Sequence, residues 1–559
     1  MTDSVVPVAA GLGDRFEQVF PKLTPAQVSR VAAHGHARPV QPGEVLVEPG
    51  ERTTRFFVVK EGVVEIVRPS GGSETLIAVC EAGQFTGEVN MLSGQRSLVQ
   101  LRASQPGEVI ELDRERLLAL VQTDSELSDI LMRAFILRRV ELIAEGLGDV
   151  VLVGSNNSPG TLRLREFLTR NGHPYASVDV EKDADVQELL DRFHVGVEDV
   201  PIVICRGDQV FRNPTNQQIA DCLGFNDAID RAQIRDVVVV GAGPAGLAAA
   251  VYGSSEGLDV LVLEGNAPGG QAGSSSKIEN YLGFPTGISG QELAARAYTQ
   301  AEKFGAQVMI AKRATHLACD RKPYAIEMDE GPPVQARAVI IATGAEYRRL
   351  SLENLAQFDG AGVYYGATPL EARLCGGDEV IVIGGGNSAG QAAVFLAQTA
   401  GRVHMLVRSD GLAESMSRYL IRRIEENPAI VLRTHTEIIA LEGTDHLERV
   451  RCRDNLAGNV EIHDVRHVFV MTGAVPNTHW LDGCVALDGK GFIKTGPDLS
   501  PEDLAAAHWP LARAPHLLET SLPGVFAVGD VRAGNLKRVA SAVGEGSNSV
   551  SLVHQVLRE

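Results

Sequence analysis

Two glycine-rich turns constrain the fold of this chain more than any other feature of its sequence. Each turn follows a short apolar strand and opens an apolar helix, in RDVVVVGAGPAGLAAAVYG and again in DEVIVIGGGNSAGQAAVFLA. The turn positions are Gly241, Gly243 and Gly246 in the first motif, and Gly384, Gly386 and Ala389 in the second. At this spacing the small residues allow a tight turn, a pyrophosphate close to the backbone and close helix packing, while the helix N-terminus attracts the anion. The motifs therefore predict two doubly wound, Rossmann-like α/β domains that each bind a dinucleotide.

The residue that ends the next strand distinguishes the two nucleotides. Glu264 ends the strand VLVLE after the first turn, where a carboxylate can accept hydrogen bonds from ribose hydroxyls. Arg408 and Ser409 take the corresponding place in the second motif, and a cation there suits a 2′-phosphate. We therefore expect NADPH rather than NADH at the second turn. Arg418 is either a second phosphate contact or a solvated arginine on a helix face.

Length and composition exclude several other functions. At roughly 150 residues per domain, a chain of 559 residues is multidomain. A formal net charge of −19 repels phosphate backbones and anionic membranes, so we expect neither nucleic acid nor a membrane as partner. The apolar run from Val237 to Ser255 contains glycines and a proline, and is interpreted as strand, turn and helix rather than a membrane span.

The cysteines and the N-terminus indicate the compartment. The seven cysteines are odd in number and scattered, with no C-x-x-C and no metal-ligand spacing. We therefore expect neither a disulfide framework nor a metal site. The first residues, MTDSVVPVAAGLGD, lack the basic start and apolar core of a signal peptide, so we expect a cytoplasmic, reducing location.

Before the first turn, the pattern of apolar residues and turn residues in the sequence changes twice. Residues 40–113 alternate in short apolar runs with Pro-Gly and Gly-Gly turns, and 114–145 is apolar at helical spacing, which indicates a β-roll closed by helices. From about residue 146 to 230 the pattern is strand VVLVG, helix TLRLREFLTRNG, strand YASVDVEK, helix VQELLDRF and the hairpin VEDVPIVICRGDQVF. This predicts a small α/β unit.

From Arg235 to the end the chain resembles the thioredoxin reductase family of pyridine nucleotide flavoproteins. The motifs that carry the resemblance, besides the two turns, are GGQAGSSSKIENYLGFP, IIATGA, MTGAVPNT and GVFAVGDVRAGNLKRVASAVGEG, in family order. It implies FAD at the first turn, NADPH at the second, hydride transfer between them, and a homodimer. The residues implied to hold FAD are Gly241, Gly243, Ala245, Gly246, Glu264, Gly270, Gln271, Asn280, Gly344, Gly529, Asp530, Arg538, Val539 and Ala540. Those implied to hold NADPH are Gly384, Gly386, Asn387, Ser388, Ala389, Arg408 and Arg418.

The chain departs from this family at the redox-active dithiol. The family carries C-x-x-C shortly before the second turn, where this sequence has Gly366-Ala367-Thr368-Pro369, so that Gly366 and Pro369 replace the two cysteines. A dithiol relay needs one sulfur to attack and another to resolve, so electrons cannot reach thioredoxin by the family's route. No catalytic residue can be assigned from the sequence.

Four other residues bear on this interpretation. Cys375, beyond Pro369, is expected to pack rather than react. Tyr364 and Tyr365 either cover the flavin or substrate face or belong to the core. Ala245 separates the chain from the bacillithiol disulfide reductase type, which carries a cysteine inside the first glycine-rich loop.

The small α/β unit resembles a glutaredoxin or thioredoxin-like domain without its cysteines. Ser158-Pro159-Gly160-Thr161 stands where that fold has C-P-x-C, and Val200-Pro201 resembles its cis-proline. Hydroxyl groups do not exchange disulfides. Cys205 is expected to be buried in a strand, with a role as a lone thiol as the alternative. We therefore interpret this unit as a redox-silent adaptor.

The N-terminal part resembles a cyclic nucleotide-binding domain. The resemblance lies in VQPGEVLVEPGERTTRFFVVKEGVVEIV and in FTGEVNMLSGQRSLVQLRA, which is similar to a phosphate-binding cassette. It implies that Gly87 allows close approach, Glu88 accepts the ribose 2′-hydroxyl, and Arg96 and Ser97 hold the cyclic phosphate. The alternative is a member that binds no ligand, since LVQL follows where the family has small residues.

These observations predict five segments and one leading function. The segments are 1–146 (cyclic nucleotide-binding-like sensor), 147–230 (thioredoxin-like), 231–352 (FAD, first part), 353–475 (NADPH) and 476–559 (FAD, second part). The leading hypothesis is an NADPH-dependent FAD oxidoreductase regulated by a cyclic nucleotide or another ligand at the N-terminal domain. One alternative is direct electron transfer to a small redox protein or a quinone, as in ferredoxin or flavodoxin reductases, and the other is a non-catalytic redox sensor or scaffold.

Overall fold

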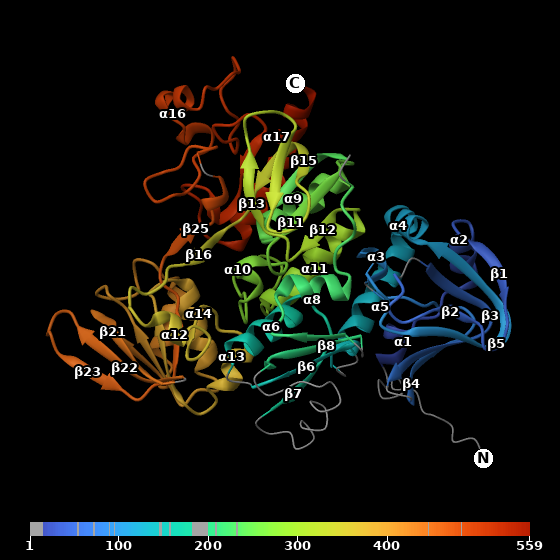
Figure 1. Ribbon diagram of the computed structural model, residues 1–559, viewed down its shortest axis with the longest axis horizontal. Coiled ribbons are helices and arrows are strands. Elements are labelled where there is room, and N and C mark those ends of the chain that lie inside the picture. The colour runs from blue at the N-terminus through green and yellow to red at the C-terminus, as the bar shows by residue number, and fades with distance from the viewer. Residues whose placement is uncertain are drawn as a thin grey trace. The chain divides into compact units, whose positions relative to one another are not determined.

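The computed structural model describes residues 15–52, 55–70, 73–88, 90–93, 95–144, 148–155, 158–180, 199–206, 209–230, 233–444, 446–481 and 483–559. The chain divides into two compact units (Figure 1), of which the first contains 1–154, 171–230 and 299–311, and the second contains 155–170, 231–298 and 312–559. Among the described residues, no helix has the length and apolar character needed to cross a membrane.

The first unit begins with an antiparallel sheet of strand order β1-β5-β3-β4, in which β2 also pairs with β5. The strands are β1 (His36–Val40), β2 (Val45–Val47), β3 (Arg55–Ser70), β4 (Ser73–Cys80) and β5 (Gln100–Asp113). The helices around it are α1 (Phe16–Val19), α2 (Pro25–Ala32), α3 (Asn90–Ser93), α4 (Arg114–Thr123) and α5 (Ser125–Ala144). The predicted strands followed by helices are therefore confirmed.

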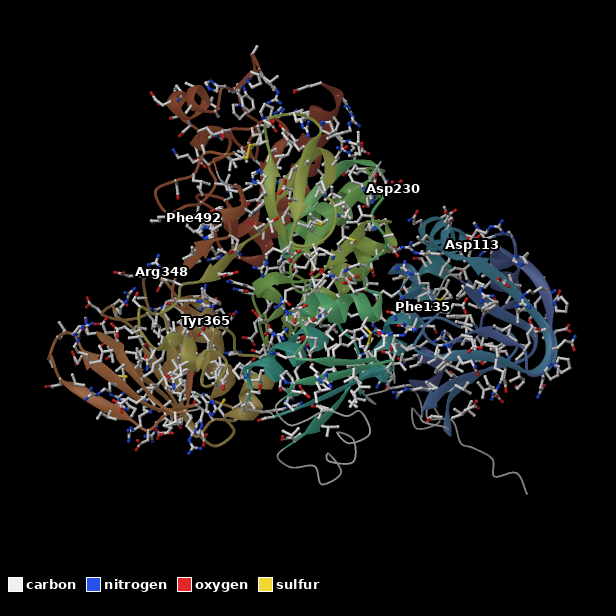
Figure 2. All side chains as sticks on the ribbon, viewed as in Figure 1. Asp113, Phe135, Asp230, Arg348, Tyr365 and Phe492 are labelled. Atoms are coloured by element: carbon white, nitrogen blue, oxygen red, sulfur yellow. A yellow bond between two sulfur atoms is a disulfide. The ribbon has the colours of Figure 1, made fainter. Side chains whose placement is uncertain are left out.

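Buried aromatic side chains pack this sheet against α5. Phe56 of β3, Phe85 and Phe135 of α5 are fully buried, with ring centroids 5.8 to 6.2 Å apart, and Figure 2 labels Phe135. The predicted single helical stretch is broken at Asp124, whose carboxylate accepts the backbone N–H of Leu127 at 3.0 Å and so caps α5.

The rest of the first unit contains a four-stranded sheet of order β7-β6-β8-β9. β6 and β7 are parallel, while β8 is antiparallel to both β6 and β9. Its elements are β6 (Val150–Gly154), β7 (Ala176–Asp179), β8 (Ile202–Cys205), β9 (Gln209–Arg212) and α8 (Asn216–Leu223), and β12 (Gln307–Ile310) also belongs to this unit. The Val200-Pro201 peptide bond is cis, as predicted. The predicted helix VQELLDRF lies outside the described residues.

The expectation that the cysteines form no disulfides is wrong. Cys205 of β8 is bonded to Cys222 of α8, and Cys319 is bonded to Cys484 in the second unit. These partners are 17 and 165 residues apart, so only the tertiary fold brings them together and their spacing carried no signal. Cys80, Cys375 and Cys452 are free and buried. The alternative of a lone Cys205 thiol is therefore also excluded.

The second unit contains a mixed sheet built on the first glycine-rich turn, in which β13/β14 and β14/β15 are antiparallel, and a parallel sheet built on the second turn. The neighbouring strands β11-β10-β15-β14-β13 of the mixed sheet include parallel pairs β11/β10 and β10/β15, and β26 extends this sheet in parallel beside β15. The elements are β10 (Ile234–Val240), α9 (Pro244–Ser255), β11 (Val260–Glu264), α10 (Gly270–Gly273), β13 (Ala314–Ala318), β14 (Tyr324–Met328), β15 (Val334–Ile341), β26 (Val525–Ala527) and α17 (Val539–Arg558). Helix α11 (Gly290–Lys303) begins in this unit. The run from Val237 to Ser255 thus forms strand, turn and helix, as predicted.

The parallel sheet has the order β17-β24-β18-β19-β20 and is built on the second turn. Its elements are β17 (Val363–Tyr364), α13 (Pro369–Leu374), β18 (Glu379–Ile383), α14 (Asn387–Leu396), β19 (Arg402–Leu406), α15 (Arg418–Glu425), β20 (Ile430–Arg433) and β24 (His467–Val470). An antiparallel sheet accompanies it, formed by β21 (Thr436–Gly443), β22 (Leu447–Asp454) and β23 (Val460–His463). The chain passes between the two sheets through β16 (Ala345–Tyr347) and β25 (Ala474–Pro476), which pair antiparallel.

The remaining elements of the second unit are short. They are α6 (Pro159–Arg170), α12 (Leu355–Phe358), η3 (His479–Leu481), η4 (Gly496–Asp498), α16 (Pro501–Ala506) and η5 (Gly529–Val531). Of these, α6 and η5 contribute residues to the site described next.

Candidate active site

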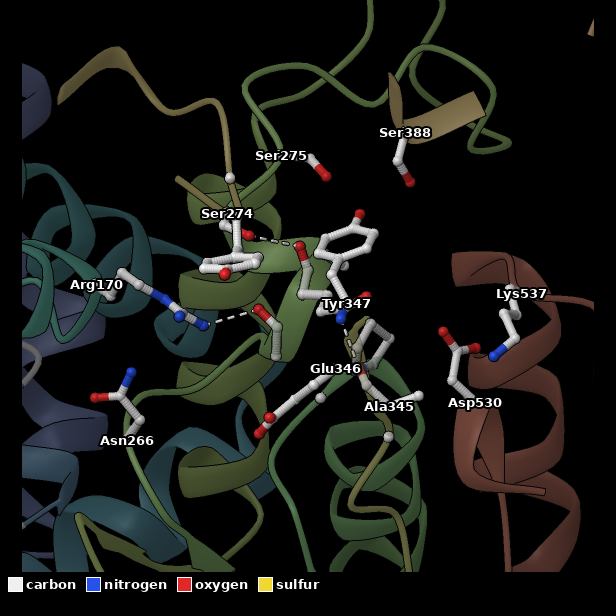
Figure 3. A pocket seen from close by; sticks show the side chains of 18 of the residues that line it. Arg170, Asn266, Ser274, Ser275, Ala345, Glu346, Tyr347, Ser388, Asp530 and Lys537 are labelled. Atoms are coloured by element: carbon white, nitrogen blue, oxygen red, sulfur yellow. Dashed lines mark hydrogen bonds between the residues drawn. The ribbon is translucent and has the colours of Figure 1, made fainter. Parts of the chain in front are cut away.

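A cavity of about 710 Å³ lies in the second unit, where both glycine-rich turns open. Its walls come from the first turn, α6, α10, the segments around Gly344 and Gly366, the start of α14, and the chain around Asp530. In Figure 3, Arg170 and Asn266 lie at the left of this cavity and Asp530 and Lys537 at its right. We call it the central cavity.

The first turn forms a cradle on the wall of the central cavity. A Cβ on Gly246 would lie 1.8 Å from the carbonyl oxygen of Gly241, so the turn and α9 are in direct contact. A Cβ on Gly243 would meet only the Cα of Gly270, at 4.0 Å, so this position faces open space. Gly243 is also the N-cap of α9. The cradle therefore has the space and the helix N-terminus that a pyrophosphate requires.

Glu264 lies beside this cradle. Its carboxylate accepts the backbone N–H groups of Ala242 and Asn266, both at 2.8 Å. Burial raises the pKa of Glu264, although these hydrogen bonds oppose the rise. A fixed, half-buried acceptor at this place suits ribose hydroxyls.

The residues implied to hold FAD lie on the cavity wall, with two exceptions. Gly344 has a positive φ of 64°, and the Gln271 side chain donates a hydrogen bond to the carbonyl oxygen of Ala345. The lining members of the set are Gly241, Gly243, Ala245, Glu264, Gly270, Gln271, Asn280, Gly344, Gly529, Asp530, Arg538 and Val539. Gly246 packs behind the turn, and Ala540 is exposed and does not line the cavity.

Asp530 marks the opposite end of the cavity from Asn266 in Figure 3. Burial raises the pKa of its carboxyl, and the nearby ammonium group of Lys537 opposes this rise. The turn that carries Asp530 is held by Glu545 of α17, which accepts the backbone N–H of Gly529 at 2.7 Å and pairs with Arg532 at 2.6 Å. Asp530 is thus a fixed acceptor in the cavity.

The second turn opens on the same cavity. Gly386 is the N-cap of α14, and a Cβ there would meet nothing within 4 Å. Asn387 and Ser388 line the cavity, and the Asn387 carboxamide oxygen accepts both the N–H and the hydroxyl of Ser417 at 2.8 and 2.9 Å. Ala389 packs beneath the turn, where its Cβ would be 3.2 Å from a Cβ on Gly384.

Arg408 and Arg418 do not line the cavity. Both are exposed, Arg408 shortly after β19 and Arg418 at the first position of α15. Neither side chain makes a hydrogen bond or ion pair with a residue in the described part of the chain. Two exposed cations beside the second turn leave both interpretations of Arg418 open.

The place of the lost dithiol also lies on the central cavity. Gly366 and Thr368 line it, and a Cβ on Gly366 would be 3.9 Å from that of Ser274. The backbone N–H and the hydroxyl of Thr368 both donate to Glu371, whose pKa is raised by burial. Pro369 is the first residue of α13. The position therefore has an alcohol and a carboxyl group where the family has two thiols.

Tyr364 and Tyr365 both line the central cavity and pack against the core, so neither expected role is excluded. The Tyr364 ring packs on Phe469 with centroids 5.3 Å apart, and burial raises the pKa of its phenol. The Tyr365 hydroxyl donates to Asp359 at 3.0 Å, and its pKa is raised to about 12, mainly by burial.

Sequence reasoning missed several lining residues. Tyr347 lies on β16 and lines the cavity, and burial raises the pKa of its phenol. Arg170 is the last residue of α6, far along the chain from either turn. The lining residues that were not assigned a role are Arg163, Glu166, Arg170, Asn266, Ser274, Ser275, Tyr347, Glu371 and Lys537. Of these, only Ser274, Ser275 and Lys537 lie inside recognised family motifs and so had a local signal.

The residues implied to bind a cyclic nucleotide lie in the first unit and are engaged within it. Glu88 pairs with Arg139 of α5 at 3.4 Å, and the Arg139 Nε donates to the carbonyl oxygen of Gly172 at 2.9 Å. Arg96 donates to the carbonyl oxygen of Gly50 at 2.9 Å, and its Nε is buried without a partner in the described chain.

Gly87 and Ser97 are the other two residues implied to bind the cyclic nucleotide. Gly87 has a positive φ of 98°, and its carbonyl oxygen accepts from Arg138 at 2.7 Å. Ser97 donates its hydroxyl to the carbonyl oxygen of Val99 at 2.8 Å. The cassette is thus tied to backbone carbonyls and to α5.

Comparisons with known proteins match two families to this chain. The pyridine nucleotide-disulphide oxidoreductase family matches residues 235–546, and the cyclic nucleotide-binding domain matches residues 37–124. Thioredoxin reductase of Bacillus subtilis is 31% identical over 327 residues, which are 58% of this chain and 96% of that protein. NADPH-dependent thioredoxin reductase 3 of Arabidopsis thaliana is 30% identical over 361 residues, 61% of this chain and 63% of that one.

A solved structure shows the same similarity. The crystal structure of T. acidophilum thioredoxin reductase aligns with a TM-score of 0.52 and 28% identity, over 59% of this chain and all of that one. The resemblance to thioredoxin reductases and to cyclic nucleotide-binding domains is therefore confirmed. The thioredoxin-like interpretation of residues 147–230 stays a prediction.

Proposed function

The chain belongs to the pyridine nucleotide-disulphide oxidoreductase family, and from that premise we propose that it is an NADPH-dependent flavoprotein reductase whose electrons leave without a dithiol. Its cofactors are those of the thioredoxin reductases, FAD and NADPH. When bound, they supply the two-electron chemistry, with hydride passing from the nicotinamide to the flavin. The protein binds and orients the two cofactors and provides the site at which electrons pass to the acceptor.

The residues at the first turn fit FAD. Gly243 leaves space at the N-terminus of α9 for the pyrophosphate, and the Glu264 carboxylate, held by two backbone N–H groups, can accept ribose hydroxyls. Asp530 offers a buried acceptor to the ribityl chain at the other end of the cavity. This chain's residues therefore bind the two ends of one extended dinucleotide.

The residues at the second turn fit NADPH. Gly386 leaves open space at the N-terminus of α14, and Arg408 is an exposed cation for the 2′-phosphate. Asn387 and Ser388 belong both to this turn and to the central cavity. They can therefore orient a nicotinamide nucleotide toward the FAD site.

The single observation that carries the proposal is that Gly366 and Thr368 line the same cavity as both turns. The two nucleotide sites are thus retained, whereas the position that would take electrons from the flavin has no sulfur. Direct transfer to a quinone or a small redox protein needs no thiol, so we propose these as the acceptor.

We further propose that a cyclic nucleotide at Glu88 and Arg96 regulates this reductase. Arg139 links Glu88 to the carbonyl oxygen of Gly172. A ribose hydroxyl that binds Glu88 competes with Arg139, and an anionic phosphate competes with the Gly50 carbonyl oxygen for Arg96. The ligand would therefore change contacts that connect the sensor to the chain beyond α5.

A set of turnover assays tests the proposal on the full-length, FAD-loaded protein. We expect NADPH oxidation with a quinone or dye as acceptor, and none with a thioredoxin-coupled disulfide. Robust disulfide reduction without added thiols would overturn the direct-transfer proposal, and no turnover with any acceptor would favour the non-catalytic sensor.

The regulatory part has its own test. We expect cyclic AMP or cyclic GMP to change the rate in the wild type but not in Arg96→Ala, whereas Arg116→Ala, an exposed side chain on α4, should respond as the wild type does. A rate that neither nucleotide changes in the wild type, with no binding by calorimetry, would contradict the regulatory proposal while leaving the reductase proposal intact.

A further inference from the structure

We infer that Arg170, the last residue of α6, is an FAD-binding residue whose guanidinium neutralises charge at the dinucleotide cradle of the first turn. This inference rests on the proposed use of FAD. Arg170 lies outside residues 235–546, which match the oxidoreductase family, so its role cannot be transferred from that family. It would make the FAD site depend on a segment far earlier in the chain.

The position of Arg170 is fixed by hydrogen bonds within the second unit. Its Nη2 donates to the carbonyl oxygen of Gly270 at 2.8 Å. A Cβ on Gly270 would lie 3.2 Å from the Cα of Gly243, the open position of the cradle. Arg170 is therefore hydrogen-bonded to Gly270, which lies directly beside Gly243, where a pyrophosphate would bind.

The Arg170 guanidinium has an N–H group that can still donate a hydrogen bond. Nη1 pairs with Glu166 one helical turn earlier, at 3.3 Å, and the side chain is only 15% exposed. The Nε is buried and has no hydrogen-bond partner in the described part of the chain. A buried donor without a partner is costly, and an anionic group in the cavity would supply the missing acceptor.

The charge balance at this end of the cavity also requires a cation. The Glu264 carboxylate lies beside the cradle, and a bound dinucleotide would add two phosphate charges. Burial raises the pKa of Glu264, and the positive charge of Arg170 opposes that rise, which places the guanidinium within electrostatic reach of the carboxylate.

The cavity wall carries further cations, namely Arg163, Arg349, Lys537 and Arg538. Figure 3 shows Arg170 and Asn266 on one side and Lys537, beside Asp530, on the other. Arg170 therefore lies on the side of the cavity opposite Lys537.

Helix α6 is held to the FAD-binding part of the second unit by a further contact. The Gln291 side chain of α11 donates to the carbonyl oxygen of Thr169 at 2.7 Å. Because this contact already fixes the end of α6, the Arg170 side chain loses little conformational freedom when it binds an anion. By linkage, bound FAD would in turn stabilise α6 in this position.

Reconstitution of the full-length apoprotein with FAD, followed by flavin fluorescence, tests the inference. We expect Arg170→Gln to raise the dissociation constant for FAD by about tenfold or more, the loss of one charge-assisted hydrogen bond, and Arg170→Lys to raise it less. Arg133→Gln, which removes an exposed arginine of α5 paired with Asp129, is the matched control and should bind FAD as the wild type does.

The salt dependence separates a charge contact from a packing role. Affinity for FAD should fall with KCl in the wild type and in Arg170→Lys, and should fall less steeply in Arg170→Gln. Equal affinity and equal salt dependence in all variants would overturn the inference, as would a lower melting temperature of the Gln variant with unchanged FAD affinity. A wild-type protein that binds no FAD would instead overturn the proposed function itself.

Discussion

The Cys375 thiol donates a hydrogen bond to the carbonyl oxygen of Glu371, 3.0 Å away, immediately after α13. Cys375 is fully buried in the core of the NADPH-type sheet, and burial raises its pKa to about 12. It is the cysteine that follows the lost dithiol most closely in the sequence. Because only a thiolate attacks a disulfide, this residue cannot take over the missing role.

The first prediction concerns this thiol. At pH 8 the Cys375 side chain stays protonated, because the pH lies far below its raised pKa, so iodoacetamide should not modify it until the protein unfolds. Cys375→Ala should keep dye reductase activity within about twofold, since the thiol acts only in packing. Peptide mass spectrometry measures the modification, and rapid labelling in the native protein or loss of turnover in a folded Ala variant would contradict the assignment.

The second prediction concerns Glu264. Glu264→Gln keeps the shape but removes the charge that two backbone N–H groups stabilise. We expect the dissociation constant for FAD to rise by about 10- to 100-fold. Glu327→Gln, an exposed position on β14, is the control and should not change it. Unchanged affinity in the Glu264 variant, measured by flavin fluorescence, would mean that the first turn does not bind the ribose.

Local motifs were sufficient to predict the two strand-turn-helix units. Gly241 and Gly384 both have a positive φ, a local backbone requirement that the glycine motif itself indicates. The strands of the N-terminal sheet were equally predictable, because β5 alternates between buried and more exposed residues. In both cases the residues that carry the sequence pattern are the same residues that form the element.

Features that depend on distant parts of the chain could not be predicted in this way. Cys319 and Cys484 are bonded across 165 residues, and Arg170 contacts a carbonyl oxygen 100 residues later. Neither pairing follows from periodicity, spacing or motif. Ala540 shows the opposite error, because it belongs to a recognised motif but is exposed at the start of α17. Sequence therefore indicated the two turns, and only the fold showed which other residues share their cavity.

The third prediction concerns nucleotide preference. Arg408→Ala should raise KM for NADPH by about tenfold and leave KM for NADH unchanged, because only NADPH carries the 2′-phosphate. Arg418→Ala distinguishes a second phosphate contact, which raises KM for NADPH, from a solvated arginine, which changes nothing. Arg422→Ala, exposed on the same helix as Arg418, is the control. Equal KM changes for both nucleotides in the Arg408 variant would contradict this assignment.

The fourth prediction concerns the disulfides. Thiol titration of the unfolded, unreduced protein should give the three free cysteines, Cys80, Cys375 and Cys452, and peptide mapping should recover the 205–222 and 319–484 pairs. Replacing Cys319 and Cys484 by serine should lower the free energy of unfolding by about 2–4 kcal/mol, because the bond closes a long loop. A titration that finds all seven thiols in freshly purified protein would contradict both pairings.

The central claim is that NADPH reduces the flavin of this protein and that no thiol is needed to pass the electrons on. Anaerobic stopped-flow absorbance, with FAD-loaded protein first treated with iodoacetamide, tests it most directly. We expect NADPH to bleach the visible flavin absorbance as fast as the enzyme turns over, and a quinone to restore it. Binding of NADPH with a flavin that stays oxidised, or reoxidation that iodoacetamide abolishes, would contradict the claim.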